Sequence, residues 1–234
     1  MSAVIECINI SKQYKGGCQA LDNVSLNCQS GRIVGLLGPN GSGKTTLIKI
    51  LEKLLVPTGG TFAIAGQTDP VEIKKIVSYL PDCNFLGDTL TVKDALDYFQ
   101  TFFEDFDRPR AEEMMEKLGI TGTQYLKTMS KGTKDKLQLV LVMSRRAKLY
   151  LLDEPIGGVD PATRDFILHT IVANTDEDSS VLISTHLISD VEPILDEAVF
   201  INNGRIVLKS TVDAIREEHG KSVNDYFREV FKCY

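Results

Sequence analysis

A glycine-rich segment constrains the fold of this chain more than any other feature of its sequence. Residues 38–46 read Gly-Pro-Asn-Gly-Ser-Gly-Lys-Thr-Thr and fit the pattern G-x-x-x-x-G-K-[ST]. The apolar run at 32–37 before the segment predicts a short buried strand. The apolar-periodic run from 44 to about 54 after it predicts a helix. A strand, a glycine turn and a helix in this order predict an α/β unit with an anion site at the turn.

The residue types in the segment suit a nucleotide phosphate chain. Glycines allow backbone N–H groups to surround a phosphate without side-chain obstruction, and the following helix directs its positive end at the anion. Lys44 can reach the β- and γ-phosphates, and the Thr45 hydroxyl can bind Mg²⁺. We therefore predict a nucleotide site made by nine consecutive residues, namely Gly38, Pro39, Asn40, Gly41, Ser42, Gly43, Lys44, Thr45 and Thr46.

A second apolar run ends in two carboxylates and a proline. Residues 149–152 predict a strand at the centre of a parallel sheet, and Asp153-Glu154-Pro155 follows it. The carboxyl end of such a strand lies beside the phosphate turn in sheets of this kind. Asp153 is expected to hold Mg²⁺ through water, and Glu154 is expected to polarise an attacking water. Without the glycine-rich segment, the two acids would be an ordinary strand-to-loop junction.

The remaining pattern predicts one α/β domain over residues 1–234 with a helical insert. Between 91 and 146 the chain predicts helices only, and Thr91, Pro109 and Ser130 are suited to helix starts. Pro161 is expected to begin another helix that ends near Ala173, and two short helices are expected at the end of the chain. The other strands are expected at 4–10, 21–26, 62–65, 76–80 and 181–184, and in a hairpin at 199–208 with Asn202-Asn203-Gly204 as its turn.

Composition narrows the class of protein. The formal net charge of -6 argues against DNA or RNA as a partner, because nucleic-acid-binding surfaces are usually basic. The five cysteines have no paired metal spacing, which is typical of free thiols in a reducing compartment. No signal segment is expected at the start, and apolar stretches such as 137–143 are too short to span a bilayer.

Six motifs in order along the chain resemble the ABC ATPase family, and the resemblance covers essentially the whole sequence. Besides the phosphate turn they are an aromatic at Tyr14, the Q-loop-like Tyr79-Leu80-Pro81-Asp82, the signature-like Met129-Ser130-Lys131-Gly132-Thr133, the D-loop-like Gly158-Val159-Asp160 and the switch-like Ser184-Thr185-His186. The implied fold is an α/β P-loop NTPase with an antiparallel β subdomain and a helical subdomain at approximately 82–148.

The resemblance also implies roles for these residues. Tyr14 would stack on adenine, and His186 would contact the γ-phosphate and hold the water with Glu154. The signature residues Ser130, Lys131, Gly132 and Thr133 would face the γ-phosphate bound by a second cassette, either a copy or a related subunit. Asp160 would lie at that dimer contact. ATP with Mg²⁺ would then join two subunits, with Thr45, Asp82 and Asp153 as the metal-binding residues.

Two positions depart from the family pattern. Asp82 stands where the family usually has Gln, and its carboxylate can still bind Mg²⁺ or a water on it. Lys131 replaces the first glycine of the signature, at a helix start where a cation opposes the helix dipole. Either Lys131 is a solvated loop lysine, or its charge meets the γ-phosphate of the partner subunit.

Two apolar surfaces have alternative interpretations. Six aromatics lie between 85 and 106, and we expect most of them to form the small core of the helical insert. The rest, with residues 83–88, would line a groove for a cytoplasmic helix of a membrane subunit. The final stripe of Val223, Tyr226, Phe227, Val230 and Phe231 either packs on the chain's own body or contacts a partner.

The resemblance as a whole implies an ATP-hydrolysing subunit that powers a separate membrane permease, more in the manner of an exporter of the ABC-2 type than of an importer. It would be located at the cytoplasmic face of the cell membrane through that permease. The alternative is a soluble ABC ATPase of translation control or DNA maintenance. Those proteins carry two cassettes or long coiled-coil insertions, and neither feature occurs here. A P-loop kinase would leave the signature and Ser184-Thr185-His186 unexplained.

Overall fold

The structure is a computed structural model that describes residues 3–232. Strands β1 (Ala3–Gln13), β2 (Gln19–Gln29) and β4 (Gly59–Ile64) form a three-stranded antiparallel sheet with the order β2-β1-β4. Buried and exposed residues alternate along much of β1 and β2, as expected for a sheet with one face on the core. The strands predicted at 4–10 and 21–26 are confirmed, and both extend further than predicted.

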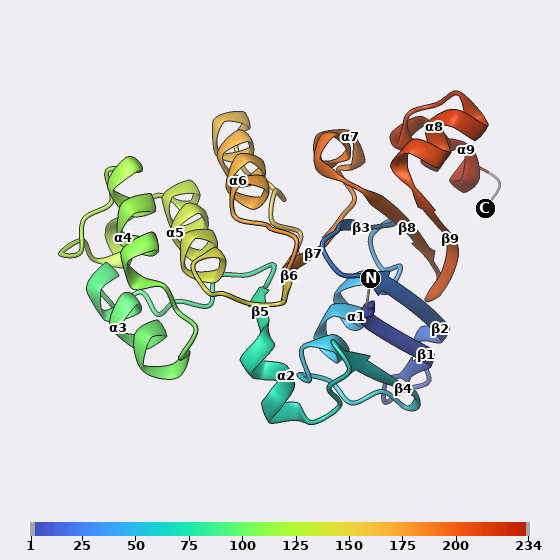
Figure 1. Cartoon of the computed structure of the whole chain (residues 1–234), viewed down its shortest axis with the longest axis horizontal. Helices are drawn as coiled ribbons and strands as arrows, with labels where there is room; N and C mark the ends of the chain where they lie inside the picture. Colours follow the sequence, from blue (N-terminus) through green and yellow to red (C-terminus); the bar gives the residue numbers. More distant parts are fainter. Residues whose placement is uncertain (1–2, 233–234) are drawn as a thin grey trace.

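A six-stranded sheet occupies the centre of the molecule, with the order β5-β6-β7-β3-β8-β9 (Figure 1). Its strands are β5 (Val77–Leu80), β6 (Leu149–Asp153), β7 (Ser180–Thr185), β3 (Ile33–Leu37), β8 (Glu197–Asn202) and β9 (Arg205–Thr211). The first five are parallel, and β9 is antiparallel to β8. Every residue of β3, β6 and β7 is buried, because apolar layers cover both faces of the sheet.

The alternation of side chains along β6 separates these two layers. Leu149 and Leu151 pack with the three-stranded sheet and helix α1 (Lys44–Leu51). Tyr150 and Leu152 pack on the opposite face, with helices α5 (Lys131–Met143) and α6 (Pro161–Ala173). Helices α7 (Ile188–Val191), α8 (Val212–His219) and α9 (Val223–Lys232) contribute to that second layer. The prediction of a central strand with two buried faces is therefore confirmed.

Helices α3 (Val92–Phe102), α4 (Arg108–Lys117) and α5 form a group at one side of the sheets (Figure 1). They have an apolar core of their own, which includes Leu96, Phe99, Phe106, Met115 and Leu137. The predicted helix starts are confirmed: Thr91 forms a capping box with Asp94, Pro109 lies in the first turn of α4, and Ser130 caps α5.

Three local features differ from the predictions. Helix α2 (Pro70–Ile76) was not predicted, although the Asp69 side chain accepts from the N–H groups of Val71 and Glu72 and Pro70 follows it as a helix start. Helix α1 ends at Leu51 and not near Leu54, since Lys53 adopts a left-handed backbone with φ 61°. Helix α7 follows β7 after a short loop and was also not predicted.

The C-terminal stripe packs on the chain's own body. Phe200 of β8 contacts the rings of Tyr226 and Phe227, at centroid distances of 6.1 and 5.1 Å. The Glu192 carboxylate accepts from the N–H groups of Val223 and Asn224 and so anchors the start of α9. Of the two interpretations of this stripe, the structure supports the intramolecular one. Within 3–232, no helix combines the length and the apolar character needed to cross a bilayer.

Candidate functional site

The glycine-rich turn joins the end of β3 at Leu37 to the start of α1 at Lys44. At two positions of this turn, the backbone of another strand lies so close that only glycine fits. A Cβ at Gly38 would lie 2.3 Å from the carbonyl oxygen of Ile201. A Cβ at Gly43 would lie 2.6 Å from the carbonyl oxygen of Ala20, and Gly43 has φ +108°. The turn is therefore packed against both sheets and cannot accept larger residues at these positions.

Lys44 is folded back into this turn. Its side chain is buried, and Nζ donates to the carbonyl oxygens of Gly38 at 2.9 Å and Pro39 at 3.2 Å. The same ammonium lies 3.4 Å from Oε1 of Glu154. The positive charge is thus held at the mouth of the turn, where an anion could be bound.

Asp153 ends strand β6, which β7 separates from β3 in the central sheet, and it is fully buried. Its Oδ1 accepts from the hydroxyls of Ser184, at 2.5 Å, and Thr45, at 3.1 Å. Its Oδ2 is buried and has no hydrogen-bond partner among the described residues. Burial raises the pKa of the Asp153 carboxyl, while the two hydroxyl donors oppose that shift.

These atoms fit a bound Mg²⁺. Oδ2 of Asp153 and the hydroxyl of Thr45 are oxygen ligands of the type that this ion prefers. No cluster of three or more His, Cys, Asp or Glu residues suited to a metal occurs among residues 3–232. A Mg²⁺ ion held by these two residues would complete its shell with water and phosphate oxygens, as this ion usually does at nucleotide sites.

Glu154 follows Asp153 with a left-handed backbone, at φ 48°. Its N–H donates to the carbonyl oxygen of Ser184 at 3.0 Å, which fixes this strained conformation against β7. Its Oε2 lies 3.0 Å from His186 Nδ1 and accepts from the Thr185 hydroxyl at 3.1 Å. Since Oε1 faces Lys44, the carboxylate bridges two of the predicted site residues. The role of Thr185 was missed, although it belongs to the Ser184-Thr185-His186 segment.

Two further predicted residues lie around this centre. Tyr14 is half exposed after β1, and its hydroxyl is 3.4 Å from Oγ1 of Thr46. Asp82 follows β5, which lies next to β6 in the sheet. Its negative charge adds to the effect of burial in raising the pKa of the Asp153 carboxyl. Asp82 lines a cavity of about 410 Å³ together with Lys131 and Glu154.

The signature-like segment starts a different helix. Ser130 caps α5 by accepting from the N–H of Thr133 at 3.2 Å. A Cβ at Gly132 would lie 3.3 Å from Oγ1 of Thr163 and 3.5 Å from Oδ2 of Asp160. Asp160 in turn caps α6 through Thr163. Signature and D-loop residues are therefore neighbours, while α5 and α1 pack on opposite faces of the central sheet.

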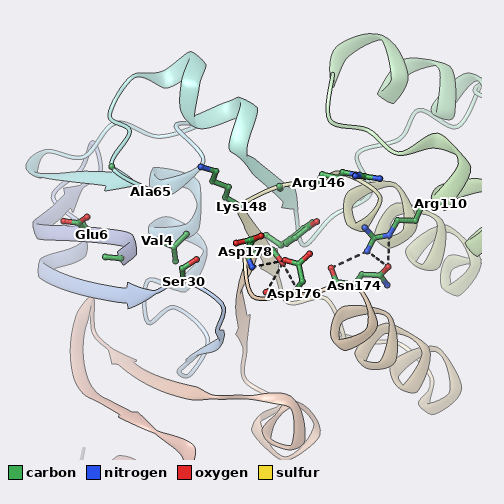
Figure 2. Close-up of a pocket in the computed structure, with 15 residues that line it drawn as sticks. Val4, Glu6, Ser30, Ala65, Arg110, Arg146, Lys148, Asn174, Asp176 and Asp178 are labelled. Carbon is green, nitrogen blue, oxygen red and sulfur yellow. Dashed lines mark hydrogen bonds between the residues drawn. The ribbon is translucent and has the colours of Figure 1, made fainter. Parts of the chain in front are cut away.

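A separate cavity of about 800 Å³ lies near the amino ends of β6 and β7, and Figure 2 shows its lining. Arg110 extends from α4 and donates from Nε to Oδ1 of Asn174 at 2.8 Å. Arg146 and Lys148 come from the segment before β6. Since its lining includes none of the predicted site residues, this cavity is distinct from the phosphate site.

Comparison with known proteins places this chain among ABC transporter ATP-binding proteins. A family model described as "ABC transporter" matches residues 21–157. The chain is 35% identical over 225 residues to the ABC transporter ATP-binding protein YtrB of Bacillus subtilis, covering 93% of this chain and 75% of YtrB. It is 29% identical to the daunorubicin/doxorubicin resistance ATP-binding protein DrrA of Streptomyces peucetius, covering 94% and 68% of the two chains. A solved ATP-binding subunit of an ABC transporter superposes with a TM-score of 0.88 at 26% identity, covering 97% and 99%.

Proposed function

The chain belongs to the ABC transporter family as an ATP-binding subunit with ATPase activity, and from that premise we propose that it hydrolyses ATP between two cassettes to drive a separate membrane permease. The observation that carries the proposal is the position of the Glu154 carboxylate, between the Lys44 ammonium and the His186 ring and one residue after Asp153. A carboxylate so placed can accept a proton from a water that attacks a phosphate bound at Lys44.

Each residue of the site has a separate role in ATP binding and hydrolysis. The turn at 38–46 binds the phosphates, with Lys44 on the β- and γ-phosphates, and Tyr14 stacks on adenine from the side of Thr46. Glu154 polarises the water, and His186 contacts the γ-phosphate. Thr45, Asp82 and Asp153 would hold Mg²⁺, and a bound Mg²⁺ would neutralise charge on the phosphate oxygens. The buried Oδ2 of Asp153, which has no hydrogen-bond partner within residues 3–232, supports this assignment.

A second cassette completes the site. Ser130 caps α5, and Lys131, Gly132 and Thr133 form its first turn, where backbone N–H and hydroxyl donors can bind an anion. We assign this turn to the γ-phosphate held by the partner cassette, with Asp160 at the same contact because it lies beside Gly132. ATP then stabilises the closed pair only to the extent that it binds the closed state better than the open one.

The permease is assigned to a groove beside the helical segment at 82–148, which we treat as a subdomain. A cavity of about 950 Å³ with a mainly apolar lining lies between this segment and the region around α2. Tyr98 and Phe102 expose their rings there, at 55% and 64%, whereas Phe99 and Phe106 are buried in the subdomain core. An apolar face of a short permease helix would cover those exposed rings.

The cellular setting follows from this partner. The chain would lie at the cytoplasmic face of the membrane, bound through the permease. Similarity to a protein named for daunorubicin/doxorubicin resistance favours export over import.

The experiment uses the purified full chain in Mg²⁺ buffer, with ATP turnover and light-scattering mass as the two readouts. Wild type should hydrolyse ATP, and Glu154→Gln should lower the rate by at least about 10²-fold while it still binds ATP and accumulates as a dimer. Glu177→Gln, at an exposed position, is the matched control and should behave as wild type. Absence of ATP hydrolysis by wild type would refute the ATPase mechanism. A Glu154→Gln protein that binds ATP and stays monomeric would refute the paired site.

A further inference from the structure

We infer that Thr185 is a positioning residue that holds the Glu154 carboxylate in the direction of the attacking water once ATP is bound. This inference rests on the proposed function and deepens its mechanism. Three side chains contact the Glu154 carboxylate among the described residues: Lys44 at Oε1, and Thr185 and His186 at Oε2. They differ in what they do when a triphosphate enters the site.

Lys44 and His186 are the two partners that a γ-phosphate would attract. Lys44 is a cation 3.4 Å from Oε1, and a phosphate group carries more negative charge than a single carboxylate. His186 lies at the surface end of the contact, with 42% of its side chain exposed, and its assigned role is to contact the γ-phosphate. If both turn to the phosphate, Thr185 alone of the three remains on the carboxylate.

The hydroxyl of Thr185 is oriented toward Glu154 by its other hydrogen bond. The residue is fully buried at the end of β7, and its backbone is paired with Leu37 of β3. Its Oγ1 accepts from the N–H of Leu187 at 3.0 Å. A hydroxyl has a single proton to donate, and among residues 3–232 the Thr185 hydroxyl donates it to Oε2 of Glu154 at 3.1 Å. The donor direction is therefore fixed by the fold and needs no nucleotide.

The backbone of Glu154 leaves its side chain dependent on such a contact. The left-handed conformation is fixed by the N–H of Glu154, which donates to the backbone oxygen of Ser184 at 3.0 Å and to Oγ of Ser184 at 3.2 Å. These bonds fix the Cα but not the rotation of the carboxylate. Thr185, the next residue of the same strand, supplies the bond that fixes the rotation.

The chemical consequence concerns the hydrolytic step. The oxygen of water forms a bond to the γ-phosphorus, the bond from that phosphorus to the bridging oxygen breaks, ADP leaves, and the water proton passes to Glu154. Misplacement of a reacting group by about 1 Å can cost on the order of 10²-fold in rate. Loss of the Thr185 hydroxyl should therefore slow turnover without weakening ATP binding, because the phosphate contacts do not involve Thr185.

The test compares Thr185→Val, Thr185→Ala and Thr185→Ser in the full chain, with kcat, KM and ATP affinity measured together. Valine and alanine should lower kcat by roughly ten- to a hundredfold, with KM and ATP affinity within about twofold of wild type. Serine, which keeps the hydroxyl, should recover kcat to within about threefold. Thr175→Val removes a hydroxyl that donates to the Ile171 carbonyl oxygen and should leave kcat unchanged.

A second arm uses the Glu154→Gln background, in which the carboxylate is absent. Thr185→Ala should there lower the residual rate by less than about threefold, because the group it orients has been removed. The inference is overturned if valine and alanine retain wild-type kcat, if serine is as impaired as alanine, or if kcat and ATP affinity fall together. If any of these results is obtained while the wild-type protein hydrolyses ATP, the Thr185 inference fails and the proposed ATPase function stands. If the wild-type protein itself does not hydrolyse ATP, the proposed function fails.

Discussion

Arg145 and Asp105 form a bidentate ion pair that joins the segment after α5 to the connection between α3 and α4. Nε of Arg145 is 2.9 Å from Oδ1 of Asp105, and Nη2 is 3.1 Å from Oδ2. The buried guanidinium also donates to the carbonyl oxygens of Val77, Lys74 and Lys75 and lies 4.1 Å from the ring centroid of Phe103. One side chain thus ties the helical segment to the start of β5, which leads to Asp82.

Removal of this guanidinium should destabilise the protein strongly. Arg145→Ala leaves Asp105 and three backbone carbonyl oxygens without their donor, and a broken buried pair typically costs about 3–5 kcal/mol. The free energy of unfolding in urea is the measurement. Arg146→Ala is the matched control, since the Arg146 side chain is 75% exposed and forms a surface ion pair with Asp107. Its effect should stay within about 1 kcal/mol. Equal losses for both variants would contradict this account of Arg145.

Gly43→Ala should destabilise the fold and abolish ATP binding. The new Cβ would lie 2.6 Å from the carbonyl oxygen of Ala20 at a residue with φ +108°, so the turn must move. We expect the free energy of unfolding to fall by an amount on the order of 2 kcal/mol or more. Gly119→Ala is the control, because Gly119 has φ +67° with nothing within 4 Å of the added Cβ. It should cost about 1–2 kcal/mol with normal ATP binding. Normal ATP affinity of Gly43→Ala would refute the close-packed turn.

Phe102→Ala should weaken permease recruitment with little effect on stability or on basal ATPase activity. Phe102 exposes 64% of its surface in the groove, so its truncation removes contact area for a partner rather than core packing. Co-purification with the membrane partner and ATP turnover of the isolated chain are the measurements. Tyr125→Ala is the control, an exposed aromatic that does not line the groove. Undiminished recruitment by Phe102→Ala would count against this docking surface.

Lys131→Glu should weaken ATP-driven pairing more than it weakens ATP binding by a single chain. Lys131 is the first residue of α5 and lines the cavity that contains Glu154 and Asp82. A negative charge there would repel the phosphate bound by the partner cassette. Dimerisation and nucleotide affinity are measured separately, with Lys127→Glu, a charge reversal before α5, as the control. Equal weakening of both properties would refute a role at the paired site.

The buried thiols should make stability fall at alkaline pH. Burial raises the pKa of Cys7 and of Cys28 to about 12, from an ordinary value of 9.0. Between those values the unfolded chain loses protons that the folded chain keeps, so the free energy of unfolding should fall as pH rises from 9 toward 12. Replacement of both thiols by alanine should flatten that decline. An equally steep decline in the double variant would contradict the assignment to these thiols.

Native labelling gives a second readout for the same groups. At pH 8, iodoacetamide should modify the exposed Cys18 and Cys83 and spare Cys7 and Cys28 until the protein unfolds. Cys233 lies outside the described residues and is identified separately by mass.

Sequence patterns predicted the parts of the site that depend on local order. The glycine turn, the strand before it and the helix after it follow from one continuous segment, and the apolar run that ends in Asp153 identified β6 by its buried faces. Motif order paired His186 with Glu154, and in the structure His186 Nδ1 lies 3.0 Å from Oε2 of Glu154. These features were predictable because each depends on residue types that few other local structures tolerate.

Other features depend on contacts between segments far apart in the chain. The left-handed backbone of Glu154 is fixed by Ser184, and the orientation of its carboxylate by Thr185; no residue near Glu154 in the sequence indicates either bond. The burial of Arg145 likewise depends on Asp105 and on the end of α2, whereas its neighbour Arg146 is exposed. Adjacent arginines with opposite environments cannot be distinguished by composition. Helix α2 could have been predicted from local sequence, because Asp69-Pro70 is a typical helix start.

The position of β3 in the central sheet has a consequence for biosynthesis. This strand carries the phosphate turn, and its neighbours on either side are β7 and β8. A ribosome synthesises residues 33–37 well before residues 180–185 and 197–202, which form the two pairing strands. Both edges of the nascent strand β3 therefore stay unpaired until β7 and β8 have been synthesised. We expect the nascent chain to depend on chaperones until residue 202 has left the exit tunnel.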